Sequence, residues 1–191
     1  MKKILVVNND DSFIYNLVEL LRTNGNCTFD VVLRVDLRQI KVADYDAILL
    51  SPGSNLPQYY PEMMDLIAQC IETHSILGVC LGYQALAVHF GAQLQLLSSP
   101  KHGHSSELTL AEVAVDLFKG ISEPIIVGRY HSWVVDRASL PAKLIVSSID
   151  EDGIVMSFRH NSLPIYGVQF HPESIMTTQG SLMINNWVAQ I

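Results

Sequence analysis

Apolar and polar positions follow one another along the first half of the chain in blocks that predict strands and helices in turn. Short apolar runs predict strands covered on both faces of a parallel sheet, whereas longer segments with apolar residues three or four positions apart predict amphipathic helices. The expected strands are Lys2–Val7, Phe29–Val35, Asp46–Leu50 and Ile76–Val79, and the expected helices begin at a Ser12 cap, run from Pro61 to His74 and follow Cys80. This order predicts right-handed βαβ units in an open, mostly parallel central sheet with helices on both faces.

Beyond Gly91 the pattern changes to short β-like runs separated by turn residues, and helical spacing returns only in Gly180–Ile191. The expected strands here are Gln93–Leu97, Ser105–Leu110, Ile125–Val127, Trp133–Val135, Leu144–Ser148, Ile154–Arg159 and Ile165–Phe170. We expect this half to extend the sheet and add a smaller antiparallel layer, with the last helix packing back onto it. No linker interrupts the pattern, so residues 1–191 are expected to form a single α/β domain.

Composition limits the kinds of binding partner and the cellular compartment that we expect for this protein. A net charge of −7 without any Lys/Arg cluster argues against nucleic acid and anionic membranes as partners. No apolar run approaches the roughly 18 residues of a membrane span, and the run after Met1-Lys2-Lys3 is too short for a signal-peptide core. Three cysteines, odd in number and without the spacing of metal ligands, predict a reduced, cytoplasmic protein without a bound metal.

The segment Gly78-Val79-Cys80-Leu81-Gly82 joins an expected strand to an expected helix. It is the thiol counterpart of the nucleophile elbow, in which a sharp strand-to-helix turn raises the nucleophile above the sheet. The two glycines leave room for this turn because they lack a Cβ, and the N-terminus of the following helix favours the thiolate. A small buried cysteine at a strand end is the alternative interpretation, but the flanking glycines favour a nucleophile.

A cysteine nucleophile requires a base and a group that orients the base. His171-Pro172-Glu173 follows the apolar strand that ends at Phe170, and the carboxyl ends of parallel strands are where sites collect in open α/β sheets. By itself His-x-Glu is also compatible with a surface pair; together with the elbow it predicts a Cys80/His171/Glu173 triad. The N–H groups of Leu81 and of Gly53, in the turn Pro52-Gly53-Ser54, are candidate oxyanion donors. His74 and His160 are expected at solvated ends, and His102 and His104 lack a third metal ligand.

Taken together, these segments resemble the class I, triad-type glutamine amidotransferases over nearly the whole chain. The matching segments are Asn9-x-Asp11-Ser12-Phe13-x-x-Asn16-Leu17, Ser51-Pro52-Gly53, Gly78 to Gln84, His102-Gly103, Arg129-Tyr130-His131-Ser132 and Gly167 to Ser174. The elbow and His-Pro-Glu-Ser segments are shared across the class. The first and fifth segments are similar to those of glutaminase subunits that serve chorismate-utilising synthases. The resemblance implies a flavodoxin-like fold and no cofactor.

The resemblance also implies residue roles. Cys80 would attack the side-chain amide of L-glutamine, His171 would transfer the proton and Glu173 would orient the imidazole of His171. Gly53 and Leu81 would hold the oxyanion. The remaining substrate contacts implied are Ser54, Asn55, Gln84, Ser132 and Trp133. Ser54 and Asn55 stand where the family's turn usually has Pro-Gly, and His104 stands where Lys is commoner, in a loop expected to face the partner.

The implied function is release of ammonia from glutamine and its delivery to a partner synthase subunit, because the chain has no domain of its own for chorismate. Whether that partner makes anthranilate, aminodeoxychorismate or both stays open. Two alternatives remain: a stand-alone γ-glutamyl hydrolase, and a catalytically weak regulatory subunit.

Overall fold

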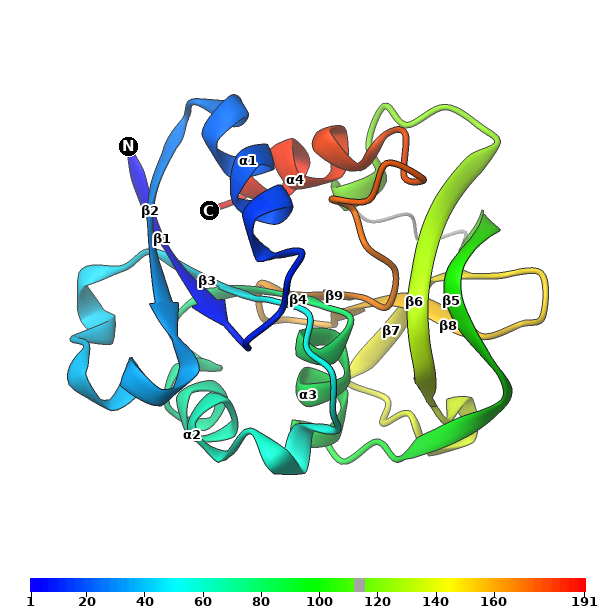
Figure 1. The fold of residues 1–191 in the computed structure, drawn as a ribbon, viewed down its shortest axis with the longest axis horizontal. Coiled ribbons are helices and arrows are strands. Elements are labelled where there is room, and N and C mark those ends of the chain that lie inside the picture. The colour runs from blue at the N-terminus through cyan, green and yellow to red at the C-terminus, as the bar shows by residue number, and fades with distance from the viewer. Residues whose placement is uncertain (112–115) are drawn as a thin grey trace.

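The computed structural model describes residues 1–111 and 116–191, and these form one mixed sheet with helices on both faces (Figure 1). The strand order is β2-β1-β3-β4-β9-β8-β7-β5-β6. The strands are β1 (Lys2–Asn8), β2 (Cys27–Leu33), β3 (Ala47–Leu50), β4 (Ser75–Val79), β5 (Leu94–Leu110), β6 (Ile125–Val135), β7 (Leu144–Ile149), β8 (Val155–His160) and β9 (Ile165–Val168). The strands from β2 to β9 in this order are parallel, and those from β8 onward pair antiparallel. The predicted fold class is confirmed.

Two pairs of helices cover the sheet, one pair on each face, as Figure 1 shows. The α-helices are α1 (Ile14–Asn24), α2 (Pro61–Cys70), α3 (Leu81–His89) and α4 (Gly180–Val188), and short 3₁₀ turns occupy Arg34–Gln39, Val42–Asp44, Pro57–Tyr59, Asp116–Phe118 and Arg137–Ser139. Ile4 and Val6 of β1 pack with α1 and α4, whereas Leu5 and Val7 pack with α2 and α3. Successive residues of a strand point to opposite faces, so the uniformly apolar strand serves two cores. None of the described helices is both long and apolar enough to cross a bilayer.

Several predicted boundaries in the first half are wrong by a few residues. α1 begins at Ile14 without a Ser12 cap; instead the Asp11 side chain accepts a hydrogen bond from the N–H of Phe13 at 2.7 Å. α2 ends at Cys70, short of the expected His74. β2 begins at Cys27 and ends at Leu33, because a 3₁₀ turn starts at the next residue.

The second half differs more from its prediction. The expected strands Gln93–Leu97, apart from Gln93 itself, and Ser105–Leu110 belong to one long strand, β5. Ile125–Val127 and Trp133–Val135 belong to its partner, β6. The turn-like residues around Gly103 do not end the strand, since the pairing continues past them through shifts in register. The two strands form a long ribbon at the edge of the sheet opposite β2, as Figure 1 shows.

Candidate active site

Cys80 lies at the sharp turn between β4 and α3, as the elbow motif predicts. Its backbone has φ 51° and ψ −100°, a conformation that residues with a Cβ rarely adopt and that costs on the order of 1–3 kcal/mol. A Cβ on Gly78 would lie 2.5 Å from the carbonyl group of Gly82, and one on Gly82 would lie 2.5 Å from the carbonyl oxygen of Leu50. Both flanking glycines are therefore required by close backbone approach, and the surrounding structure holds the strained turn in place.

Parallel pairing of β4 with β9 brings the second predicted segment to the elbow. The N–H of Cys80 donates to the carbonyl of Val168 at 2.8 Å, and the chain then turns at His171. Nδ1 of His171 lies 2.7 Å from Oε1 of Glu173, and both side chains are buried. Nε2 of His171 is also buried and has no hydrogen bond of ordinary geometry to the described residues. The predicted Cys80, His171 and Glu173 thus come together at one end of the sheet.

The charge state of His171 follows from its surroundings. Burial lowers the pKa of the imidazole, but its interactions with Cys80, followed by the hydrogen bond and charge of Glu173, raise that pKa well above 6.5. The balance favours the imidazolium form of His171. Such an imidazolium can give a proton to a leaving amine.

The position of His171 depends on strand β6 as well. The backbone N–H of His171 donates to the carbonyl of Gly128 in β6 at 2.9 Å, and the carbonyl of His171 accepts from Oγ1 of Thr177 at 2.7 Å. The rings of Phe13 and Tyr130 contact the imidazole edge-on, with centroids 5.8 and 5.0 Å away. Backbone and ring contacts from three separate segments therefore determine how the imidazole is oriented.

A cavity of about 400 Å³ opens in front of Cys80 and His171, within the range typical of small-ligand sites. Its lining includes most of the predicted substrate contacts, namely Gly53, Ser54, Asn55, Gln84, Ser132 and Trp133. Leu81 and Glu173 do not line the cavity; both are buried, Leu81 next to Cys80 in the chain and Glu173 against His171. The predicted residues form one site.

The two candidate oxyanion donors adjoin each other. A Cβ on Gly53 would lie 2.3 Å from Cδ2 of Leu81, so the turn after β3 rests against the elbow. The N–H groups of Gly53 and Leu81 have no acceptor among the described residues. Free N–H groups beside the nucleophile are suited to a developing oxyanion.

Sequence reasoning missed several residues of this cavity. Asp11, Phe13 and Tyr130 line it without having been assigned a role. Burial raises the pKa of Asp11, while the N–H of Phe13 and the charge of His171 lower it. Gln169 is fully buried, and its Nε2 donates to Sγ of Cys80 at 3.7 Å. A polar residue just after an otherwise apolar strand was the available signal for Gln169.

The remaining histidines lie elsewhere or at the rim. Nε2 of His102 lies 3.3 Å from Oγ of Ser132 at the edge of the cavity, and the part of the chain that is described contains no group of three or more ligands placed for a metal. His160 is buried rather than solvated, and its Nδ1 accepts hydrogen bonds from the N–H groups of Ser162 and Leu163.

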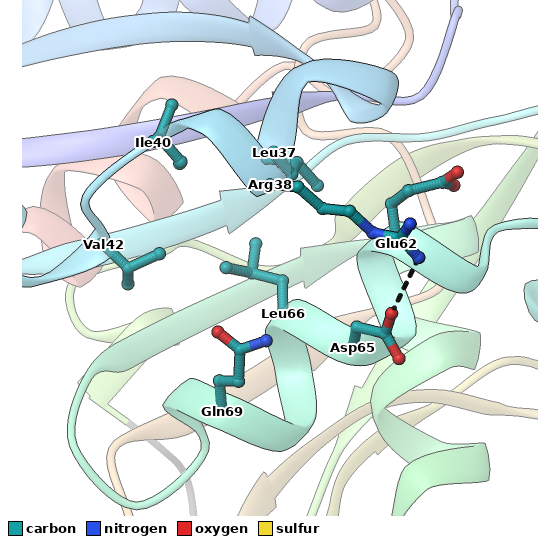
Figure 2. Close-up of a pocket in the computed structure, with 8 residues that line it drawn as sticks. All are labelled: Leu37, Arg38, Ile40, Val42, Glu62, Asp65, Leu66 and Gln69. Atoms are coloured by element: carbon teal, nitrogen blue, oxygen red, sulfur yellow. Dashed lines mark hydrogen bonds and ion pairs between the residues drawn. The ribbon is translucent and has the colours of Figure 1, made fainter.

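Figure 2 shows a smaller pocket of about 190 Å³ between α2 and the 3₁₀ turns that follow β2. Leu37, Ile40, Val42 and Leu66 form its apolar side, and an ion pair between Arg38 and Asp65, with 3.4 Å between nitrogen and oxygen, crosses its rim. This lining contains no cysteine, serine or histidine, whereas the cavity at the elbow contains both Cys80 and His171. The candidate chemistry therefore belongs to the cavity at the elbow.

Comparison with known proteins agrees with this geometry. The family profile described as Glutamine amidotransferase class-I matches residues 5–191. Anthranilate synthase component 2 of Mycobacterium tuberculosis is 39% identical to this chain over 191 residues, covering 97% of this chain and 81% of the relative. Aminodeoxychorismate/anthranilate synthase component 2 of Bacillus subtilis is 35% identical over 189 residues, covering 97% and 95%. A crystal structure of a glutamine amidotransferase from Thermotoga maritima has the same fold, with a TM-score of 0.81, 16% identity and coverage of 99% and 97% of the two chains. The chain belongs to the class-I glutamine amidotransferase family.

Proposed function

We propose that this chain is the glutaminase subunit of a chorismate-utilising synthase, and that Cys80, His171 and Glu173 act as its catalytic triad. The observation that carries the proposal is the strained Cys80 elbow, which shares one cavity with an imidazole held by a buried carboxylate. Relatives described as anthranilate or aminodeoxychorismate synthase component 2 support the choice of glutamine as substrate and of a synthase as partner.

In the proposed reaction, Sγ of Cys80 attacks the side-chain amide carbon of glutamine. The carbonyl oxygen becomes an oxyanion beside the N–H groups of Gly53 and Leu81, and His171 gives a proton to the amide nitrogen. The C–N bond breaks, ammonia leaves and a glutamyl thioester remains on Cys80. His171 then takes a proton from water, whose oxygen attacks the thioester, and glutamate and the thiolate are released.

Two exposed apolar side chains, each close in sequence to a residue of the site, support a partner subunit. Ile175, two positions after Glu173, is 96% exposed, and Tyr15, two positions after Phe13, is 72% exposed. Large exposed apolar side chains are suited to burial by another protein.

The test is hydrolysis of glutamine by the purified chain, alone and with the synthase that co-purifies with it, followed as glutamate and ammonia released. Cys80→Ala is expected to abolish release in both states, and the product made from chorismate identifies the partner. Full release by Cys80→Ala would overturn the assignment of the nucleophile. Fast hydrolysis of γ-glutamyl peptides, unaffected by any synthase, would instead indicate a stand-alone hydrolase.

A further inference from the structure

A buried arginine begins a chain of hydrogen bonds that leads toward the candidate active site. Arg129 is fully buried, and its Nη1 pairs with Oδ2 of the equally buried Asp150. Its Nε donates to Nε2 of His131 at 3.2 Å. A guanidinium can only donate hydrogen bonds, so Nε2 of His131 must be the unprotonated ring nitrogen and Nδ1 must carry the hydrogen.

The donor-to-acceptor direction of these hydrogen bonds continues into the wall of the cavity. Nδ1 of His131 lies 3.1 Å from the carbonyl oxygen of Trp133, which only accepts, so the ring donates to it. The same carbonyl accepts from Nε2 of Gln84 at 2.8 Å, and both of its lone pairs are then used. Nε2 of Gln84 also donates to Oε1 of Gln169 at 3.0 Å. Both hydrogens of the Gln84 amide are therefore committed to the protein.

These contacts leave the amide oxygen of Gln84 without a donor among the described residues, on a side chain that lines the cavity. The orientation is not a free choice, because turning the amide over would place its oxygen against the carbonyl of Trp133. An amide oxygen at the wall is an acceptor, and it is suited to the ammonium group of an α-amino acid. The carbonyl of Trp133, already bonded twice, has no lone pair left for that group.

His131 stays neutral in this arrangement. Burial lowers the pKa of its imidazole to about 3, and the nearby charge of Arg129 acts in the same direction. An imidazolium would direct a second N–H at the guanidinium, which has no acceptor to offer. The direction of the hydrogen bonds is therefore constant over the pH range in which proteins work.

We propose that Arg129 and His131 are positioning residues for recognition of the substrate's ammonium group: they fix the carbonyl of Trp133, which fixes the amide of Gln84 with its oxygen toward the cavity. Neither residue touches the reacting atoms. The inference rests on the proposed function in taking glutamine as the amino acid, but the hydrogen-bond direction itself does not depend on catalysis.

The test compares glutamine with 5-amino-5-oxopentanoate, which has the same amide and carboxylate but no amino group. The ratio of kcat/KM for the two compounds is measured in the wild-type chain and in His131→Leu, which removes both ring nitrogens. We expect the ratio to fall about tenfold or more in His131→Leu, mostly through a higher KM for glutamine, because a hydrogen bond to a charged group is lost. If His131 has only a structural role, kcat/KM falls equally for both substrates and their ratio stays unchanged. That result would overturn the proposal.

Two further variants separate the nitrogens and replace His131→Leu if it does not fold. His131→Asn keeps an N–H close to the position of Nδ1, and His131→Gln keeps an acceptor close to the position of Nε2. We expect His131→Asn to keep more of the preference for glutamine than His131→Gln; the reverse order would contradict the proposal. His160→Leu, which removes a similarly buried imidazole away from the cavity, is the matched control and should leave the ratio unchanged.

Binding to the Cys80→Ala chain, measured by calorimetry, distinguishes this inference from the proposed function. If the wild-type chain hydrolyses neither compound even with its synthase bound, but Cys80→Ala binds glutamine more tightly than the analogue in a manner that depends on His131, the inference stands and the glutaminase assignment fails. If the wild type hydrolyses glutamine and His131 affects neither the ratio nor binding, the inference fails alone. Absence of both hydrolysis and binding would overturn both.

Discussion

The parallel and antiparallel parts of the sheet hold the candidate site by different physical means. On the parallel side, close approach of backbones positions Cys80: a Cβ at Gly78 or Gly82 would lie 2.5 Å from neighbouring backbone atoms. On the antiparallel side, a chain of buried hydrogen bonds that starts at Arg129 positions the cavity wall. Steric exclusion tolerates no added atom, whereas a polar network tolerates any change that keeps its donors and acceptors paired.

Glu173 lies in the loop where the two parts meet, and its loss is expected to have the largest effect. Glu173→Gln keeps the shape of the side chain but removes the charge that orients His171 across 2.7 Å. We expect kcat for glutamine hydrolysis to fall by about 10²-fold or more, as is typical when the group behind a catalytic histidine is neutralised. Steady-state assays of glutamate release measure this, and a loss below twofold would remove Glu173 from the triad.

Glu173→Gln should also shift the pH dependence of glutamine hydrolysis. The folded-state pKa of His171 is raised above 6.5, so stability from its charged form is complete below about pH 6.5 and is lost as the pH rises through the folded value. Glu173→Gln removes two of the interactions that raise the pKa, so the ionisation of His171 in the profile of kcat/KM should move to lower pH. An unchanged profile would mean that Cys80 alone sets this pKa.

Asp150→Asn tests the polar side of the comparison. The change leaves the buried guanidinium of Arg129 without a counter-charge, so the free energy of unfolding should fall by about 3–5 kcal/mol in urea titrations. Adding Arg129→Met removes the orphaned charge and should recover much of the loss. If the double variant is no more stable than Asp150→Asn alone, the unpaired charge of Arg129 is not the cause of the lost stability.

Gly78→Ala tests the steric side. The new Cβ would meet backbone atoms of Gly82 and the N–H of Tyr83, which cannot move aside, so we expect a loss of about 3 kcal/mol in unfolding free energy. Gly120→Ala is the control: its φ is +74° but nothing lies within 4 Å of the added Cβ. It should cost only about 1 kcal/mol, from backbone conformation alone. Equal losses would mean that crowding at the elbow is not the constraint.

A surface pair gives the smallest expected effect. Arg38 and Asp65 at the rim of the pocket in Figure 2 are well over half exposed, so water screens their attraction. Asp65→Asn should change the unfolding free energy by less than about 0.5 kcal/mol. A loss comparable to that of Asp150→Asn would show that burial is not what distinguishes the two ion pairs.

The parallel part could be predicted from the sequence because its signals are local. Apolar runs such as Ile76–Val79 mark strands buried on both faces, and the glycines beside Cys80 mark the elbow itself. His171 and Glu173 follow an apolar strand, and the rule that sites collect at the carboxyl ends of parallel strands was enough to bring them to Cys80.

The rest could not be predicted because it depends on pairings distant in the sequence. β5 continues through Gly103 only because β6 lies opposite it, and a turn-like residue within a long ribbon has the same local pattern as a turn. Arginine is a residue type that is usually exposed, so the sequence alone suggests an exposed Arg129. Its burial can be inferred only when Asp150, which follows β7, is known to lie beside it. Gln169 likewise acquires a role only from its contacts with Gln84 and Cys80.

The bridge between Gly128 and His171 has a mechanical consequence. Strand β6 supplies none of the three predicted triad residues, yet the carbonyl of its Gly128 accepts a hydrogen bond from the backbone of His171, while the backbone of Cys80 is held by β4 and β9. Tyr130 of the same strand also contacts the imidazole. The spacing between Cys80 and His171 is therefore set jointly by the parallel strands and by the antiparallel ribbon of β5 and β6.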